Sequence, residues 1–195
     1  MNPPGDGSYF NLGKVCRSEG RWAEAEAALR KALEIDSQKV WVRIELGALY
    51  LDQDRVSEAA AEFEWAIASD RSSGKAHCQL GRIYHRQGRW PEAEAALHLA
   101  LELDPRDGGA CVELGALYLD QDRVSEAEAV FKKALELDPE NGWVCIELGT
   151  LYLEQDKLSE AAAQFKSAIA KDQKKRGGSL PAGPDLSQAG PMAGG

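Results

Sequence analysis

The chain has 195 residues, 44% of them apolar, and a formal net charge of −9. This apolar content is enough for a sizeable core, whereas the acidic balance argues against nonspecific binding to nucleic acid or to an anionic membrane surface. No apolar run approaches the roughly 20 residues that span a bilayer, and the N-terminus has no signal-peptide pattern, so we expect a cytoplasmic protein.

The chain is organised around a Leu-Gly dipeptide that returns every 34 residues. It stands at Leu12-Gly13, Leu46-Gly47, Leu80-Gly81, Leu114-Gly115 and Leu148-Gly149. An alanine follows each glycine after 12 and again after 19 residues, with a large apolar residue between the two alanines. Small residues at fixed offsets let two antiparallel helices approach closely, and larger ones fill the space between them. Since one such pair cannot bury its own apolar face, the pattern predicts an all-α array of stacked helix pairs.

In chain order, a short lead-in at residues 1–5 precedes five predicted helix pairs, each with a helix A, a tight turn and a helix B. The pairs are expected at residues 6–39, 40–73, 74–107, 108–141 and 142–175. The turns carry residues that suit helix caps, namely Gly20, Asp54, Gly88, Asp122 and Asp156. Residues 176–195, rich in glycine and proline, are expected to form a flexible tail.

This spacing resembles the tetratricopeptide repeat family, whose Leu-Gly-x-x-Tyr and Ala-x-x-x-Phe-x-x-Ala patterns fall at these offsets across residues 6–175. The resemblance implies a right-handed α-solenoid. It also implies that the A helices form an inner, concave face that binds a protein or peptide partner.

Family contact positions carried onto this chain give a candidate peptide-binding groove. Its residues are Lys14, Arg17, Trp41, Ile44, Ala48, Leu51, Lys75, Cys78, Arg82, His85, Arg86, Val112, Ala116, Leu119, Trp143, Ile146 and Leu153. The resemblance thus implies an apolar floor with basic stripes, suited to a partner with apolar and acidic side chains. The open alternative is that the arginines only pair with acidic residues on neighbouring A helices, namely Asp52, Glu113 or Asp120.

No arrangement of residues points to catalysis or to a bound metal or cofactor. Cys78 and His85 are too far apart along one helix to share an ion easily. A glycine-rich phosphate loop is absent, and no nucleophile, base and orienting group can be placed together. The four cysteines (Cys16, Cys78, Cys111 and Cys145) are expected to be free thiols in a reducing compartment.

Two functions stay open on the sequence. The first is a non-enzymatic adaptor that holds a peptide, with Trp65 and Leu99 as a second, convex contact patch or as ordinary surface. The second is a structural subunit that self-associates head-to-tail into rings or filaments. There, acidic residues of the last repeat would approach basic residues of the first repeat in the next copy, as Glu45 and Asp52 are expected to approach Lys75 and Arg82.

Overall fold

A computed structural model describes residues 6–175, so the predicted lead-in and tail, residues 1–5 and 176–195, lie outside the described residues. Within 6–175 the chain forms ten α-helices and no strand, which confirms the all-α prediction. The helices fall into two compact units, one within Met1–Pro139 and the other within Glu140–Gly195.

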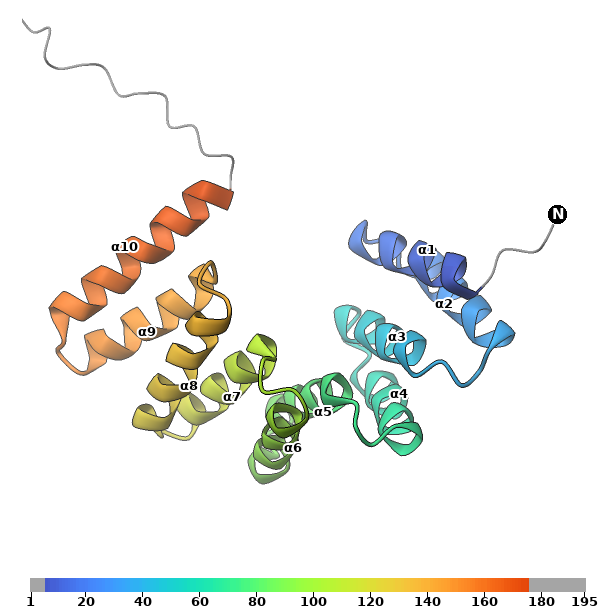
Figure 1. The fold of residues 1–195 in the computed structure, drawn as a ribbon, viewed down its shortest axis with the longest axis horizontal. Helices are drawn as coiled ribbons and strands as arrows, with labels where there is room; N and C mark the ends of the chain where they lie inside the picture. Colours follow the sequence, from blue (N-terminus) through green and yellow to red (C-terminus); the bar gives the residue numbers. More distant parts are fainter. Residues whose placement is uncertain (1–5, 176–195) are drawn as a thin grey trace, which may run out of the picture. The chain divides into compact units, whose positions relative to one another are not determined.

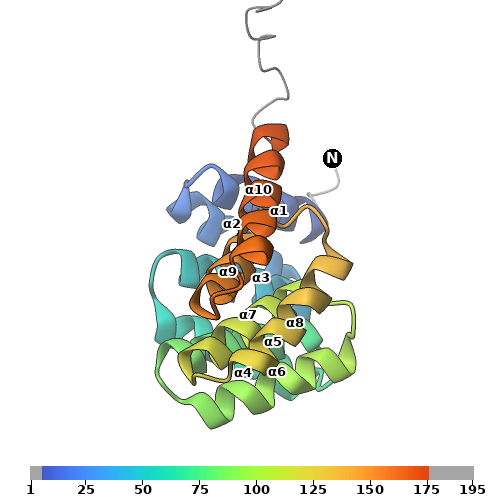
Figure 2. The same cartoon turned by 90° about the vertical axis from the view of Figure 1, so that its left-hand side faces the viewer.

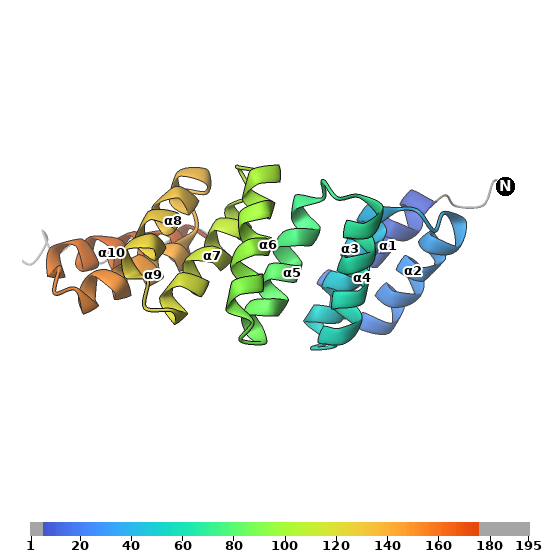
Figure 3. The ribbon, with the colours of Figure 1, turned by 90° about the horizontal axis from the view of Figure 1, so that it is seen from below.

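The first unit contains four helix pairs (Figure 1). Its A helices are α1 (Asp6–Ser18), α3 (Val40–Asp52), α5 (Gly74–Arg86) and α7 (Gly108–Asp120). Its B helices are α2 (Trp22–Ile35), α4 (Val56–Ser69), α6 (Trp90–Leu103) and α8 (Val124–Leu137). Each B helix packs on the A helix of its own pair, and α2, α4 and α6 also pack on the next A helix. The pairs therefore follow one another in chain order, as Figure 3 shows, and buried residues of the first three pairs form one core cluster.

The turn between the helices of a pair is closed by one residue in the left-handed conformation. Gly20 has φ 73° and Asp54 has φ 58°. The N–H of the residue after each returns to the last turn of helix A, Arg21 to the Cys16 carbonyl at 2.8 Å and Arg55 to the Tyr50 carbonyl at 2.8 Å. This hydrogen bond is typical of a helix C-cap, so the residues predicted to cap helices end helix A.

Each A helix crosses its B helix at the glycine of the Leu-Gly dipeptide. A Cβ added to Gly47 would lie 2.8 Å from a ring carbon of Phe63, and one added to Gly115 would lie 2.5 Å from a ring carbon of Phe131. Both phenylalanines are fully buried. The predicted close approach of the two helices at this point is confirmed.

The second unit is a helix pair of the same kind, α9 (Gly142–Glu154) and α10 (Leu158–Lys175), which lie side by side in Figure 2. Asn141 caps α9, since its side chain accepts a hydrogen bond from the Val144 N–H at 3.3 Å. The Gly149 crossing meets Phe165, with an added Cβ 2.7 Å from its ring. Phe165, however, is only half-buried.

All four cysteines are buried and free. Burial raises the pKa of the Cys78 thiol to about 12 and raises that of Cys111 as well. In the part of the chain that the structure describes, no helix is long and apolar enough to span a bilayer.

Candidate functional site

The predicted groove residues lie on the A helices. Those of the first unit are Lys14 and Arg17 on α1, Trp41, Ile44, Ala48 and Leu51 on α3, Lys75, Cys78, Arg82, His85 and Arg86 on α5, and Val112, Ala116 and Leu119 on α7. We call the surface that they form the inner face, because these helices line the inner side of this unit's curve in Figure 1. Trp143, Ile146 and Leu153 lie on α9 in the other unit.

Arg17 on α1 is held by two carboxylates of α3. Its Nη1 donates to Glu45 Oε1 at 2.6 Å and its Nε to Asp52 Oδ2 at 2.6 Å. Glu45 is only 6% exposed, so this ion pair is partly desolvated and links α1 to α3. Arg17 is therefore occupied by its own chain.

The equivalent place between α5 and α7 carries a weaker set of contacts. His85 Nε2 lies 2.8 Å from Asp120 Oδ2, and Arg82 Nη1 lies 4.0 Å from Glu113 Oε1. Burial raises the pKa of the Glu113 carboxyl above its usual range, and the nearby Arg82 and His85 offset only part of this effect. Arg82 thus lies near one of its expected acidic neighbours, and whether it also contacts a partner stays a prediction.

The direction of these ion pairs corrects one expectation from the sequence. Glu45 and Asp52 pair with Arg17 of the preceding repeat, and not with Lys75 and Arg82 of the following one. At these positions, acidic side chains of an A helix point toward the A helix of the preceding repeat. The reason is that the side of the A helix that carries them packs on this earlier helix. The 34-residue spacing is the same toward the preceding and the following repeat, so the sequence could not show with which of the two an acidic residue pairs.

A further cation of α5 is also paired. Arg86 Nη2 donates to Asp54 Oδ1 in the turn after α3, at 2.6 Å. The expected partners of Arg86 were Asp52, Glu113 or Asp120, so its ion pair is with a different carboxylate. Most residues of the predicted basic stripes therefore have an acidic partner within the chain, namely Arg17, Arg82, His85 and Arg86.

The apolar floor predicted for repeat 2 is largely covered. Ile44 is 6% exposed and Leu51 is 7% exposed, and both belong to one core cluster with Ile83 of α5. Ala48 and Cys78 are buried as well, and Val112, Ala116 and Leu119 are half-buried. These side chains hold consecutive A helices together, so a partner cannot reach most of them.

An aromatic and basic surface stays accessible at the start of α3. Trp41 is 41% exposed and meets the ring of Phe10 edge-on, with centroids 4.3 Å apart. Lys14 Nζ lies 5.6 Å from the centre of the Phe10 ring. Within residues 6–175, neither Lys14 nor the exposed Lys75 of α5 has a carboxylate partner. We call Phe10, Lys14, Trp41 and Lys75 the Trp41 patch.

Gln79, one helical turn after Lys75 on α5, adds a polar group to this region. Its side-chain oxygen is buried and has no hydrogen-bond partner among the described residues. A buried carbonyl without a donor is uncommon in folded proteins and costs free energy, so it is suited to accept a hydrogen bond from a ligand. The family contact positions carried onto this chain also include Gln79, although the sequence does not show that its oxygen is unpaired.

The predicted convex residues do not resemble each other in their surroundings. Trp65 is half-buried beneath Arg43, whose guanidinium lies 3.9 Å from the ring centre and also pairs with Glu62 at 2.9 Å. Leu99 is 37% exposed on α6. The convex patch stays a prediction.

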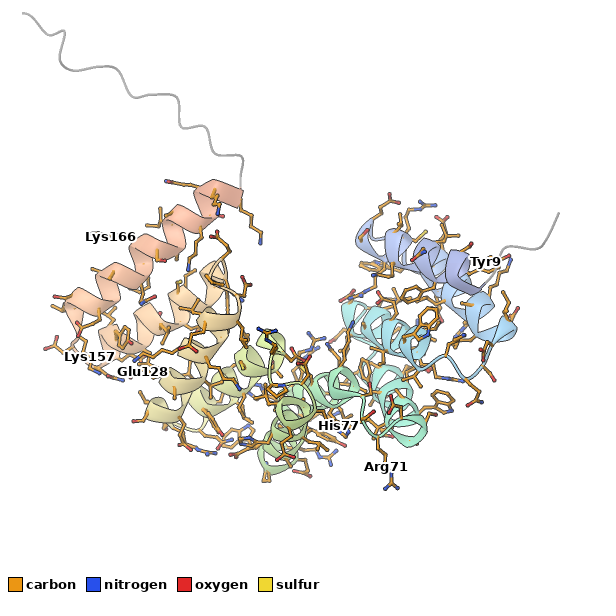
Figure 4. The ribbon with its side chains drawn as sticks, viewed as in Figure 1. Tyr9, Arg71, His77, Glu128, Lys157 and Lys166 are labelled. Carbon is orange, nitrogen blue, oxygen red and sulfur yellow. The ribbon has the colours of Figure 1, made fainter. Side chains whose placement is uncertain are left out.

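The three histidines each have a partner within the chain. His77 Nε2 lies 3.3 Å from the Arg71 carbonyl, at the corner between α4 and α5 that Figure 4 labels. His98 Nε2 lies 3.0 Å from the Tyr118 hydroxyl, and His85 contacts Asp120. Across residues 6–175, no group of three His, Cys, Asp or Glu residues is placed to hold a metal ion.

Family models described as tetratricopeptide repeats match residues 13–54, 44–108, 89–142 and 118–180. One of these models covers residues 44–142, just over half of the chain. The chain belongs to the tetratricopeptide repeat (TPR) family. Proteins built from TPR repeats mediate protein–protein interactions and are generally not enzymes. A comparison with curated proteins finds no match.

Solved structures of other TPR-like chains have the same fold. MamA is 25% identical over 85% of this chain and 96% of its own, with a TM-score of 0.68. PilF of Pseudomonas aeruginosa is 24% identical over 85% of this chain and 76% of its own, with a TM-score of 0.78. TTC0263, a TPR protein of Thermus thermophilus, is 24% identical over 88% of this chain and 96% of its own, with a TM-score of 0.75. The predicted helical repeat solenoid is thus confirmed.

Proposed function

We propose that this TPR protein is a non-enzymatic adaptor whose inner face binds a partner peptide, and that the Trp41 patch is the main contact. The partner carries a large apolar side chain next to acidic ones. The observation that supports this most is the exposed Trp41, fixed against Phe10 and accompanied by two lysines that have no carboxylate partner.

The free energy that each kind of contact contributes indicates what each residue of the Trp41 patch does. An exposed ion pair contributes only about 0–1 kcal/mol, so Lys14 and Lys75 select acidic side chains and guide association rather than supply most of the affinity. Tryptophan is enriched among residues whose truncation costs binding more than about 2 kcal/mol. Trp41 therefore supplies the anchor.

The paired cations play a smaller part in this proposal. Arg17 could contact a ligand carboxylate only by leaving Glu45 and Asp52, and Glu45 is almost fully buried. Breaking a buried ion pair of this kind is costly because it leaves a charge without a partner. We therefore assign Arg17 to the array itself, and acidic specificity to Lys14 and Lys75.

Selection from a random displayed peptide library on the full-length protein tests the proposal. Selected peptides are expected to combine a large apolar residue with neighbouring aspartate or glutamate. Trp41→Ala should weaken their binding at least about tenfold, or about 1.4 kcal/mol, and the double change Lys14→Glu with Lys75→Glu should weaken it further as salt is lowered.

Two matched variants serve as controls. Trp90 on α6 is exposed to the same extent, 41%, and Trp90→Ala should leave binding unchanged. Lys133→Glu reverses a charge on the B helix α8 and should also have little effect. Peptides without acidic residues, or full affinity in the Trp41→Ala variant, would show that the Trp41 patch is not the binding site.

A further inference from the structure

The first repeat exposes apolar residues that every later repeat of the first unit buries. On α1, Leu12 is 48% exposed and Val15 is 51% exposed. The equivalent residues of α3, α5 and α7 are between 0% and 7% exposed: Leu46, Leu49, Leu80, Ile83, Leu114 and Leu117. Because α1 is the first described A helix, the difference shows that the preceding repeat normally covers these positions. We call Leu12 and Val15 the α1 face.

The last helix pair exposes the opposite side of the repeat. Ile146 and Leu153 on α9 are 47% and 52% exposed, whereas their equivalents in repeat 2, Ile44 and Leu51, are 6% and 7% exposed beneath repeat 3. Ile169 on α10, the last described helix, is 57% exposed. Phe165 is half-buried where Phe63 is fully buried. We call Ile146, Leu153, Phe165 and Ile169 the α9–α10 face.

We propose that the α9–α10 face of one molecule binds the α1 face of a second copy of this chain. The contact repeats the one that the chain makes internally, where repeat 3 covers the corresponding residues of repeat 2. A second copy is the occupant that fits best, because the two open faces are the two halves of one interface that the first unit already contains. Such a head-to-tail contact leaves one face free at each end, and the assembly grows into a filament or closes into a ring.

The contact is apolar, unlike the charged one that the sequence suggests. Acidic residues such as Glu45 and Asp52 face the preceding repeat, so by the same register Glu147 and Glu154 on α9 do not face the incoming copy. The internal junction used as template contains the ion pair of Arg86 with Asp54. A serine, Ser18, stands at the equivalent of Arg86 on α1, so this ion pair is not repeated between copies.

Two of the four lysines of α10 have partners within their own unit. Lys171 Nζ donates to Cys145 Sγ at 2.9 Å, and Lys174 Nζ donates to Glu140 at 3.0 Å. Both are engaged within their own unit. Association is therefore expected to persist at high sodium chloride and to strengthen with sulfate, whereas an ion-paired contact would weaken with salt.

Sedimentation velocity on the full-length protein over a wide concentration range tests the proposal. The wild-type mass should rise with concentration. A head variant, Leu12→Glu with Val15→Glu, and a tail variant, Ile146→Glu with Ile169→Glu, should each be monomeric. Mixed in equal amounts, they should form a dimer and nothing larger, since one intact face of each kind remains.

The mixing experiment separates the outcomes. A symmetric contact of like faces would let one variant dimerise alone, and that result overturns the proposal. The proposal is also overturned if the wild-type protein stays monomeric, which is the result expected if another segment of the chain covers the α9–α10 face. The altered side chains are about half exposed, so the variants should fold, with Leu12→Ser and Ile169→Ser as milder substitutes. Peptide binding by the head variant should be unchanged, so the adaptor function is tested separately.

Discussion

At the scale of single residues, the glycine at each helix crossing is irreplaceable for steric reasons. An added Cβ at Gly115 would lie 2.5 Å from the Phe131 ring, which is fully buried, so the ring would have to shift within a packed core. Gly115→Leu should therefore lower the free energy of unfolding by about 1–3 kcal/mol or more, measured by chemical denaturation. Gly7→Ala is the control, because its Cβ would meet nothing within 4 Å. Equal stability of the Gly115→Leu variant and the wild type would contradict this packing.

Glu113 gives a prediction with a defined pH dependence. Burial raises the pKa of its carboxyl in the folded state, so the folded protein binds a proton more readily than the unfolded chain. The charged carboxylate therefore costs stability, and this cost appears as pH rises through the raised pKa. Glu113→Gln should stabilise the protein at neutral pH and have less effect at acidic pH, as thermal unfolding at several pH values would show.

Glu45→Gln is the matched control for that experiment. Glu45 occupies the equivalent position in repeat 2, but Arg17 donates to it at 2.6 Å. Losing this charge leaves Arg17 with one partner fewer, so the variant should be destabilised by about 1–3 kcal/mol at neutral pH. Opposite signs for the two changes are expected, and a stabilised Glu45→Gln variant would argue against the pairing described for Arg17.

At the scale of helices, successive repeats are joined unequally on the side away from the inner face. Arg55 lies over the ring of Tyr50, 4.2 Å from its centre, and donates to Glu26 of the preceding repeat at 2.8 Å. Arg123 does the same, 4.1 Å from the ring centre of Tyr118 and 2.7 Å from a carboxylate oxygen of Glu94. This hydrogen bond lowers the pKa of Glu94. Repeats 1 and 2, and repeats 3 and 4, are thus tied by an additional ion pair.

The junction between repeats 2 and 3 lacks that ion pair. Arg89 lies over Tyr84 at 4.2 Å, but the position of the missing carboxylate is Ala60. Ala60→Glu should supply it and raise the free energy of unfolding by about 0–1 kcal/mol, the range for exposed pairs. The gain should disappear in an Arg89→Ala background. Ala61→Glu, one residue further along the exposed side of α4, should bring no such gain, and a gain of equal size there would point to a general charge effect instead.

At the scale of the whole molecule, the core of the first unit passes from one helix pair to the next. Each of these pairs covers apolar residues of its neighbour, whereas Leu12 in the first unit and Ile169 in the second stay exposed. Peptide binding is proposed for the Trp41 patch of the first unit, and self-association for the α1 face and the α9–α10 face. The Trp41 patch shares no residue with either face, so the two functions left open by the sequence are compatible.

The sequence by itself determined the ten helices, the turns between them and the crossing of Gly115 with Phe131, because these depend on local propensity and on a regular spacing of small and large residues. Tertiary structure alone decided which residues stay accessible. Whether Ile44 faces a partner or the next A helix, and whether Glu45 pairs forward or backward, depends on how successive A helices are turned toward each other. A fixed repeat length gives the same spacing to the preceding and to the following repeat, so only the packing of the helices could show which neighbour a residue contacts.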